Sequence, residues 1–193
     1  MRKVDGSELL DLGAYEQIRE RFRNRVIASK QVRRLQLGPH MSLVFENHDT
    51  MLLQIQEMIR TERITDQRAI QHELDTYNEL LPEGDRLSAT LFIEYDDAAQ
   101  RSDMLRRFSS LRERVVLRVG DALARASFSV HHGEELDRLP AVNYLIFELD
   151  PDARSRLADP GGTATLVVDH PDYAVSVALS PQLRAELAHD LAG

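Results

Sequence analysis

The stretch VVLRVGDALARASFSV, Val115–Val130, has the pattern of two β-strands joined by a turn. From Ala122 onward every second residue is alanine, phenylalanine or valine, and the residues between them are mostly polar. This period of two is typical of a strand with one exposed face, and Gly120-Asp121 predicts the turn or bulge before it. The second half of the chain is therefore expected to form antiparallel strands.

Apolar runs of similar length on both sides of this stretch predict further strands. They are Met41–Glu46, Leu87–Tyr95, Asn143–Leu149, Thr163–Asp169 and Tyr173–Leu179, with Asp169–Asp172 as a hairpin loop. Helical spacing of apolar residues and capping residues predict the helices. They are a long first helix over Leu12–Arg34, one over Thr50–Arg63, one after Thr65 or Asp66, one capped by Ser102, a short one after Asp150-Pro151 and a last one from Ser180-Pro181.

Strands that follow one another closely through tight turns favour an antiparallel or mixed sheet. We therefore predict one α+β domain over residues 1–193, with a long N-terminal helix and several helices packed mainly on one side of the sheet. Tyr15, Ile18, Phe22, Val26 and Ser29 recur at three and four residues, which predicts the core-facing stripe of the first helix.

Composition excludes several classes of protein. The chain has 193 residues, a net charge of −8 and no cysteine, so disulfides, thiolate metal sites and iron–sulfur clusters held by this chain are excluded. No apolar run is long enough to cross a bilayer, and no phosphate-binding glycine loop or nucleophile elbow is present. The expected location is the cytoplasm, and no resident cofactor is predicted.

Glu46-Asn47-His48-Asp49 stands between a predicted strand and a predicted helix. One interpretation places Glu46, His48 and Asp49 around a divalent metal, with His72 or Glu57 completing the ligands. The other makes the segment a strand-to-helix joint, in which Asn47 or Asp49 caps the helix. The joint is favoured because no metal-ligand spacing such as HExxH is present.

Two further histidine motifs are candidates for chemistry. His131-His132 precedes Gly133-Glu134-Glu135 and is the richest set of potential metal ligands, although adjacent histidines in a strand point to opposite faces. Asp169-His170-Pro171-Asp172 resembles an acid–histidine pair, but proline and aspartate are also the residues that a tight turn favours. A loop and a turn are the favoured interpretations of the two motifs.

The first predicted helix carries most of the basic charge, since Arg19–Arg34 contains seven basic residues and one acidic residue. Arg19, Arg23, Lys30 and Arg34 follow one flank of the helix and are candidates for contact with an acidic partner. Nucleic acid is a weaker alternative, because no DNA-binding motif and no tryptophan accompany the charge. In that alternative the further basic contacts would be Arg106, Arg107, Arg112 and Arg114.

Several motifs together resemble an uncharacterised bacterial family, a domain of unknown function described as a hypothetical protein in a rubrerythrin cluster. The resemblance covers essentially the whole chain. The residues that carry it are Val44–Asn47, Asp49-Thr50, Gln54–Met58, Glu62-Arg63, Glu73-Leu74, Leu87–Phe92 and Asp169–Pro171. It implies that members are often encoded beside a rubrerythrin-like diiron protein and an iron–sulfur oxidoreductase. This chain lacks the paired Glu-x-x-His helices of the diiron protein itself.

The leading hypothesis is an accessory protein without enzymatic activity of its own. It would act by protein–protein contact with a peroxide-detoxifying system of the rubrerythrin or iron–sulfur oxidoreductase type, and homo-oligomers are possible. The alternative is a metal-binding protein or metal-dependent enzyme that uses carboxylates and histidines, and nucleic-acid binding through the first helix is third. The candidate metal ligands are Glu46, His48, His72, His131, His132 and His170.

The spacing of the helix after His48 also predicts which of its side chains are buried. The residues expected to be mostly buried are Met51, Leu52, Ile55, Met58 and Ile59. Those expected nearer to solvent are Gln54, Gln56, Glu57, Arg60 and Glu62.

Overall fold

The structure is a computed structural model that describes residues 2–81, 84–129 and 137–192. Its strands are β1 (Arg34–Gln36), β2 (Met41–Phe45), β3 (Arg86–Ile93), β4 (Val115–Val119), β5 (Ala122–Phe128), β6 (Val142–Glu148), β7 (Ala164–His170) and β8 (Tyr173–Ala178). Its α-helices are α1 (Leu12–Arg33), α2 (His48–Thr61), α3 (Gln67–Asn78), α4 (Ala98–Arg107), α5 (Pro151–Ala158) and α6 (Pro181–Ala192). Two 3₁₀-helices, η1 (Gly6–Glu8) and η2 (Phe108–Glu113), complete them.

All eight strands join one antiparallel sheet in the order β1-β2-β3-β6-β5-β4-β7-β8. The sheet curls into a nearly closed barrel, with β1 and β8 at its two edges. The predicted fold class, a sheet with helices mainly on one side, is therefore wrong. The apolar faces of the strands face one another across the barrel, so the sheet covers much of its own core and does not depend on one helical layer.

The stretch Val115–Phe128 forms the predicted hairpin. Val119 pairs with Ala122, and Gly120 takes a positive φ of 56° in the turn between β4 and β5. The predicted hairpin between β7 and β8 is also formed, because His170 pairs with Tyr173. The alternation of apolar and polar residues therefore predicts the local hairpins. It does not predict that the sheet curls into a barrel.

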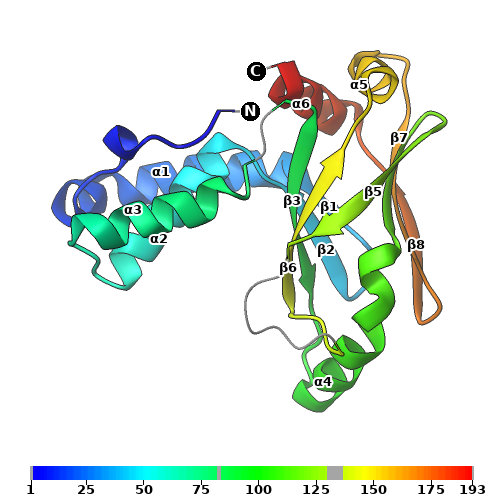
Figure 1. Ribbon diagram of the computed structural model, residues 1–193, viewed down its shortest axis with the longest axis horizontal. Coiled ribbons are helices and arrows are strands. Elements are labelled where there is room, and N and C mark those ends of the chain that lie inside the picture. The colour runs from blue at the N-terminus through cyan, green and yellow to red at the C-terminus, as the bar shows by residue number, and fades with distance from the viewer. Residues whose placement is uncertain (1, 82–83, 130–136, 193) are drawn as a thin grey trace.

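One apolar core fills the barrel, and helices cover its ends. Leu117, Leu166 and Phe147 are among its fully buried members. Side chains from α5 and α6 belong to the same core as side chains from α4 and η2. Figure 1 shows α5 and α6 at the upper end of the barrel and α4 at the lower end. The protein interior is thus a packed barrel rather than an open channel.

Helices α1, α2 and α3 form an arm that extends from the side of the barrel (Figure 1). The arm has its own apolar core, built by Val4, Met51, Ile55, Ile59, Leu74, Tyr77, Leu80 and Leu81. The predicted stripe of α1 is only partly buried: Tyr15 and Val26 are buried, whereas Ile18 is 44% exposed and Phe22 is half-buried. The arm therefore leaves apolar side chains of α1 accessible.

Several helix ends differ from the prediction; α2, for example, spans His48–Thr61 instead of Thr50–Arg63. Two of the differences have local reasons. The first helix ends at Arg33, and the next three residues form β1 because Leu35 pairs with Leu43 of β2. Helix α4 begins at Ala98 rather than after Ser102, since the Asp97 side chain accepts the Gln100 backbone N–H and caps the helix. No described helix has the length and apolar character that a membrane span requires.

Candidate functional site

The Glu46–Asp49 segment is the joint between β2 and α2. The Asn47 side chain accepts the Thr50 backbone N–H at 3.0 Å, and the Thr50 hydroxyl accepts the Asn47 backbone N–H at 2.8 Å. This reciprocal pair is a capping box. The predicted joint is thus present, with Asn47 as the cap, while Asp49 lies in the first turn of the helix.

Asn47 and Asp49 should therefore differ in their effects on stability. Asn47→Ala removes the cap and is expected to lower the free energy of unfolding by about 0.5–2 kcal/mol. Asp49→Ala removes two contacts of an exposed carboxylate, with Arg25 and with the His48 ring, both at 3.3 Å, and should change the free energy of unfolding by less than about 0.5 kcal/mol. Urea unfolding of both variants measures the difference, and a larger loss for Asp49→Ala would contradict the assignment of the cap.

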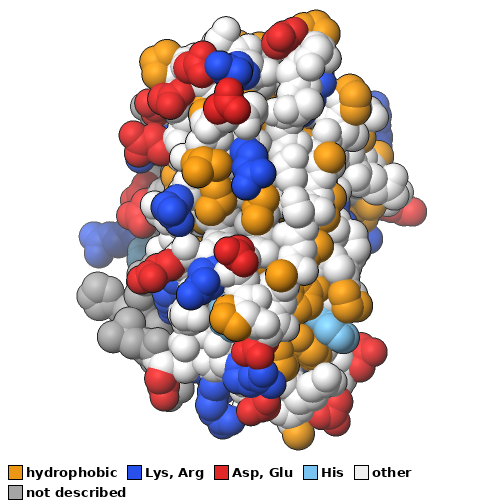
Figure 2. Space-filling model, turned by 90° about the vertical axis from the view of Figure 1, so that its right-hand side faces the viewer, with side chains coloured by type: hydrophobic (Ala, Val, Ile, Leu, Met, Phe, Trp, Pro, Cys, Tyr) orange, Lys and Arg blue, Asp and Glu red, His pale blue; other side chains and the backbone are white. Residues whose placement is uncertain are grey.

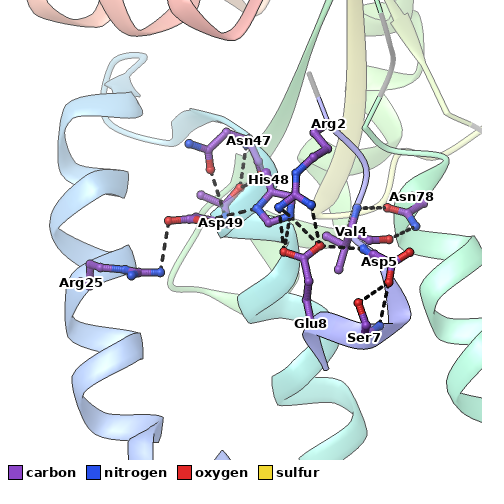
Figure 3. Close-up of polar contacts among 11 residues, drawn as sticks. Arg2, Val4, Asp5, Ser7, Glu8, Arg25, Asn47, His48, Asp49 and Asn78 are labelled. Atoms are coloured by element: carbon purple, nitrogen blue, oxygen red, sulfur yellow. Dashed lines mark hydrogen bonds and ion pairs between the residues drawn. The ribbon is translucent and has the colours of Figure 1, made fainter. Parts of the chain in front are cut away.

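His48 lies among charged groups from three segments (Figure 3). Its Nε2 is 3.1 Å from Glu8 Oε2 and its Nδ1 is 3.3 Å from Asp49 Oδ1. Arg2 also contacts both His48 and Glu8, and Arg25 contacts Asp49. Burial raises the pKa of Glu8, but hydrogen bonds from Asp5, Arg2 and His48 outweigh burial and lower it overall. His48 therefore joins residues 2–8 to the start of α2.

Residues 2–10, here called the N-terminal strap, are held by two buried or half-buried amide side chains. Asn78 accepts the Val4 N–H and donates to the Val4 carbonyl, both at 2.9 Å. Gln56 does the same with Leu10, again at 2.9 Å in both bonds. Gln56 is 2% exposed, so the prediction that it lies near solvent is wrong. Its amide is buried because it satisfies the backbone of the strap.

Glu46 does not point toward His48's partners. Its side chain is 2% exposed, and its Oε1 accepts the Thr90 hydroxyl at 2.7 Å. Its Oε2 lies 3.7 Å from Lys30 Nζ and accepts no hydrogen bond among the described residues. Glu46 thus serves the contact between α1 and the sheet, whereas His48 contacts the strap.

The other candidate metal ligands lie in separate parts of the fold. His72 is exposed on α3, and His170 is buried at the end of β7 beside Ser110. His131 and His132 lie outside the described residues. Within the described ranges, no group of three or more histidine or carboxylate side chains has the geometry to hold a metal ion.

Burial lowers the pKa of His170 below its ordinary value of 6.5. Its neutral form also fits the contacts, since Nδ1 accepts the Asp172 N–H at 3.1 Å. Below pH 6.5 the unfolded chain takes up a proton that folded His170 does not, so stability is expected to fall with pH in that range. Comparing urea unfolding of wild type and His170→Gln at pH 7.5 and 5 measures this effect. An unchanged pH dependence in the variant would contradict it.

Three of the four basic residues predicted to contact a partner are used within the chain. Arg19 makes two 2.8 Å hydrogen bonds to Glu57, Lys30 faces Glu46, and Arg34 donates to Ser42 at 2.7 Å. The Arg19 hydrogen bonds lower the pKa of Glu57 more than its burial raises it. Arg23 is exposed and makes no polar contact with the described residues.

An apolar groove lies between the N-terminal strap, α1 and α2. Its volume is about 540 Å³. Leu10, Ile18, Phe22 and Leu52 supply its apolar surface, and the exposed residues Arg21 and Arg25 also line it. The alignment of Ile18 and Phe22 on one face was visible in the sequence. Whether Ile18 and Phe22 contact α2 or solvent depends on the position of the N-terminal strap. Helical spacing within α1 does not predict that position.

Comparisons with known proteins agree with the bacterial family resemblance. The chain resembles a protein of unknown function from Burkholderia pseudomallei K96243, whose crystal structure superposes with a TM-score of 0.91. The two are 36% identical, over 98% of this chain and 100% of the other. No curated protein matches the sequence. The model of DUF3501, a family of proteins of unknown function, matches residues 3–191, and the chain therefore belongs to this family.

Proposed function

We propose that this protein is an accessory protein that acts by binding another protein through the groove on its helical arm. The observation that carries the proposal is the apolar groove itself. Ile18 on α1 is 44% exposed and Leu10 in the N-terminal strap is 36% exposed, although both are large apolar side chains. Exposed apolar surface gathered in a concave site is a common feature of binding sites.

The charges around the groove define the chemistry of the partner. Arg21 makes no polar contact with the described residues. Arg25 pairs with Asp49 at 3.3 Å and lies over the Phe22 ring, 5.1 Å from its centroid. Both guanidinium groups are exposed and lie next to Ile18 and Phe22 along α1. A segment that presents apolar side chains flanked by carboxylates would bury Ile18 and Phe22 and pair with the arginines.

The partner is proposed from the family resemblance. The resemblance implies that members of the family are often encoded beside a rubrerythrin-like diiron protein and an iron–sulfur oxidoreductase, and we propose one of these two proteins as the partner. The alternatives have less support among the described residues. No group of candidate metal ligands converges there, and the basic residues Arg19, Lys30 and Arg34 are engaged within the chain.

Co-purification from the host tests this proposal with matched variants. Ile18→Asn removes an apolar side chain of the groove, and Ile27→Asn removes one with similar exposure, 39%, outside it. Arg21→Glu and Arg23→Glu form a second pair, since both arginines are exposed on α1 but only Arg21 lines the groove.

The tagged wild-type protein is expected to recover the diiron protein or the iron–sulfur oxidoreductase. Ile18→Asn and Arg21→Glu should lose that protein, while Ile27→Asn and Arg23→Glu should retain it. Circular dichroism checks that all four variants are folded. Recovery of neither protein, or equal recovery by all four variants, would contradict the proposal.

A further inference from the structure

The barrel is open between β8 and β1. These strands are the two ends of the sheet order, and no ladder joins them among the described residues. In the described part of the chain, Tyr173 makes the only hydrogen bonds from β8 to the β1–β2 hairpin. Its hydroxyl donates to the Leu37 carbonyl and accepts the His40 N–H at 3.0 Å. This contact lies at one end of β8. The rest of the strand is a free edge.

The register with β7 shows which backbone groups occupy that edge. The Leu179 N–H donates to the Ala164 carbonyl at 2.9 Å, and the Asp169 N–H points the other way, to Arg114. In an antiparallel ladder the direction alternates along each strand. The N–H and carbonyl groups of every second residue of β8 therefore point away from β7. These residues are Ala174, Ser176 and Ala178.

The side chains of β8 also indicate an uncovered edge. Val175 and Val177 face the barrel core but are only half-buried, whereas their neighbours on β7, Val168 and Leu166, are fully buried. Ala174, Ser176 and Ala178 are exposed on the outer face. Among the described residues, β7 is the only strand that pairs with β8.

Exposed edge strands usually carry a charged residue, a proline or a bulge that prevents pairing. Residues 173–178 include no charged residue and no proline. Their pairing with β7 is one-to-one throughout, so the strand has no bulge. Figure 2 views the molecule from the side on which β7 and β8 lie in Figure 1. A vertical band of backbone and small side chains runs down this face, and most charged side chains lie beside it or beyond its ends.

We propose that β8 forms a homodimer by antiparallel pairing with β8 of a second copy, with the two-fold axis at Ser176. In this register Ser176 pairs with the partner's Ser176, and Ala174 pairs with the partner's Ala178. Each of these residues then donates and accepts one backbone hydrogen bond. Val175 comes opposite the partner's Val177 on the core side, and pairs of β-branched residues are favourable across strands.

The second copy is the occupant that the edge fits best. A strand that pairs with β8 must place apolar residues on the core side and small residues on the outer side. It should also be uncharged, because β8 offers no charged side chain to pair with. β8 itself has this pattern, with valine at 175 and 177 and alanine or serine at 174, 176 and 178. The same surface on both copies gives a closed two-fold contact.

Opposite charges at position 176 test the proposed axis. The Ser176 side chain is exposed, so Ser176→Lys and Ser176→Glu should fold normally. In the dimer each would face an identical charge across the axis, which is destabilising. Light scattering coupled to size exclusion should show a wild-type dimer and two monomeric variants. An equimolar mixture of the two variants should recover the dimer, because lysine then faces glutamate.

Two further variants control for indirect effects. Ser176→Thr keeps the N–H and adds no charge, so it should remain dimeric. Ser176→Pro removes an N–H that faces the free edge and not β7, so it should be monomeric with a melting temperature close to that of monomeric Ser176→Lys. A monomeric wild type, dimeric Ser176→Lys and Ser176→Glu variants, or no recovery of the dimer on mixing would each overturn the proposal.

Discussion

Replacing Arg33 by alanine is expected to lower the free energy of unfolding by about 3–5 kcal/mol. The Arg33 side chain is 1% exposed at the end of α1. Its guanidinium group contacts Asp190 at 2.6 Å and Glu186 at 2.9 Å, both on α6. Without Arg33, the largely buried carboxylate of Asp190 loses its counter-charge, and the link between the helical arm and α6 is lost.

The neighbouring residue provides the control. Arg34 is exposed and donates one hydrogen bond to Ser42, so Arg34→Ala should cost about 1 kcal/mol or less. The double variant Arg33→Met with Asp190→Leu replaces both charges by apolar groups and should recover part of the stability lost in Arg33→Ala. Equal stability of Arg33→Ala and Arg34→Ala in urea unfolding would show that the buried ion pair is not important for the fold.

Removing either amide that holds the N-terminal strap is expected to cost about 1–3 kcal/mol. Gln56→Ala leaves the N–H and carbonyl of Leu10 without their partner, and Asn78→Ala does the same to Val4. Hydrogen exchange adds a local measurement to urea unfolding. The Leu10 amide should exchange faster in Gln56→Ala, and the Val4 amide should exchange faster in Asn78→Ala.

Gln54→Ala is the matched control for the strap, because Gln54 is a half-buried amide on the same helix as Gln56 and forms no hydrogen bond with the described residues of the strap. It should leave the exchange of Val4 and Leu10 unchanged. Unchanged exchange in Gln56→Ala as well would mean that the strap is held by other contacts, such as those of Glu8 with Arg2 and His48.

The sequence predicts local elements of this protein better than their arrangement. Gly120-Asp121 and the alternation around it predict a hairpin because both depend on neighbouring residues. Barrel closure depends on the twist and curvature accumulated over all strands, from β1 to β8, and alternation is the same in an open sheet. The fold class was therefore wrong even though several strand positions were right.

The candidate site shows the same limit. Asn47 was one of two capping residues that the sequence allowed, and the structure decides between them. Helical spacing placed Ile18 and Phe22 in the core and Gln56 near solvent. Spacing describes only which residues share a face of one helix. The strap, which buries Gln56 and leaves Ile18 accessible, joins residues distant in sequence.

Photo-crosslinking in the host tests most directly whether the groove is a docking surface. A benzoylphenylalanine is placed at the position of Phe22, which lines the groove, or of Ile27, which is exposed on α1 outside it. After irradiation, we expect a covalent adduct with the diiron protein or the iron–sulfur oxidoreductase from position 22 and none from position 27. Adducts with neither protein, or the same adduct from both positions, would contradict it.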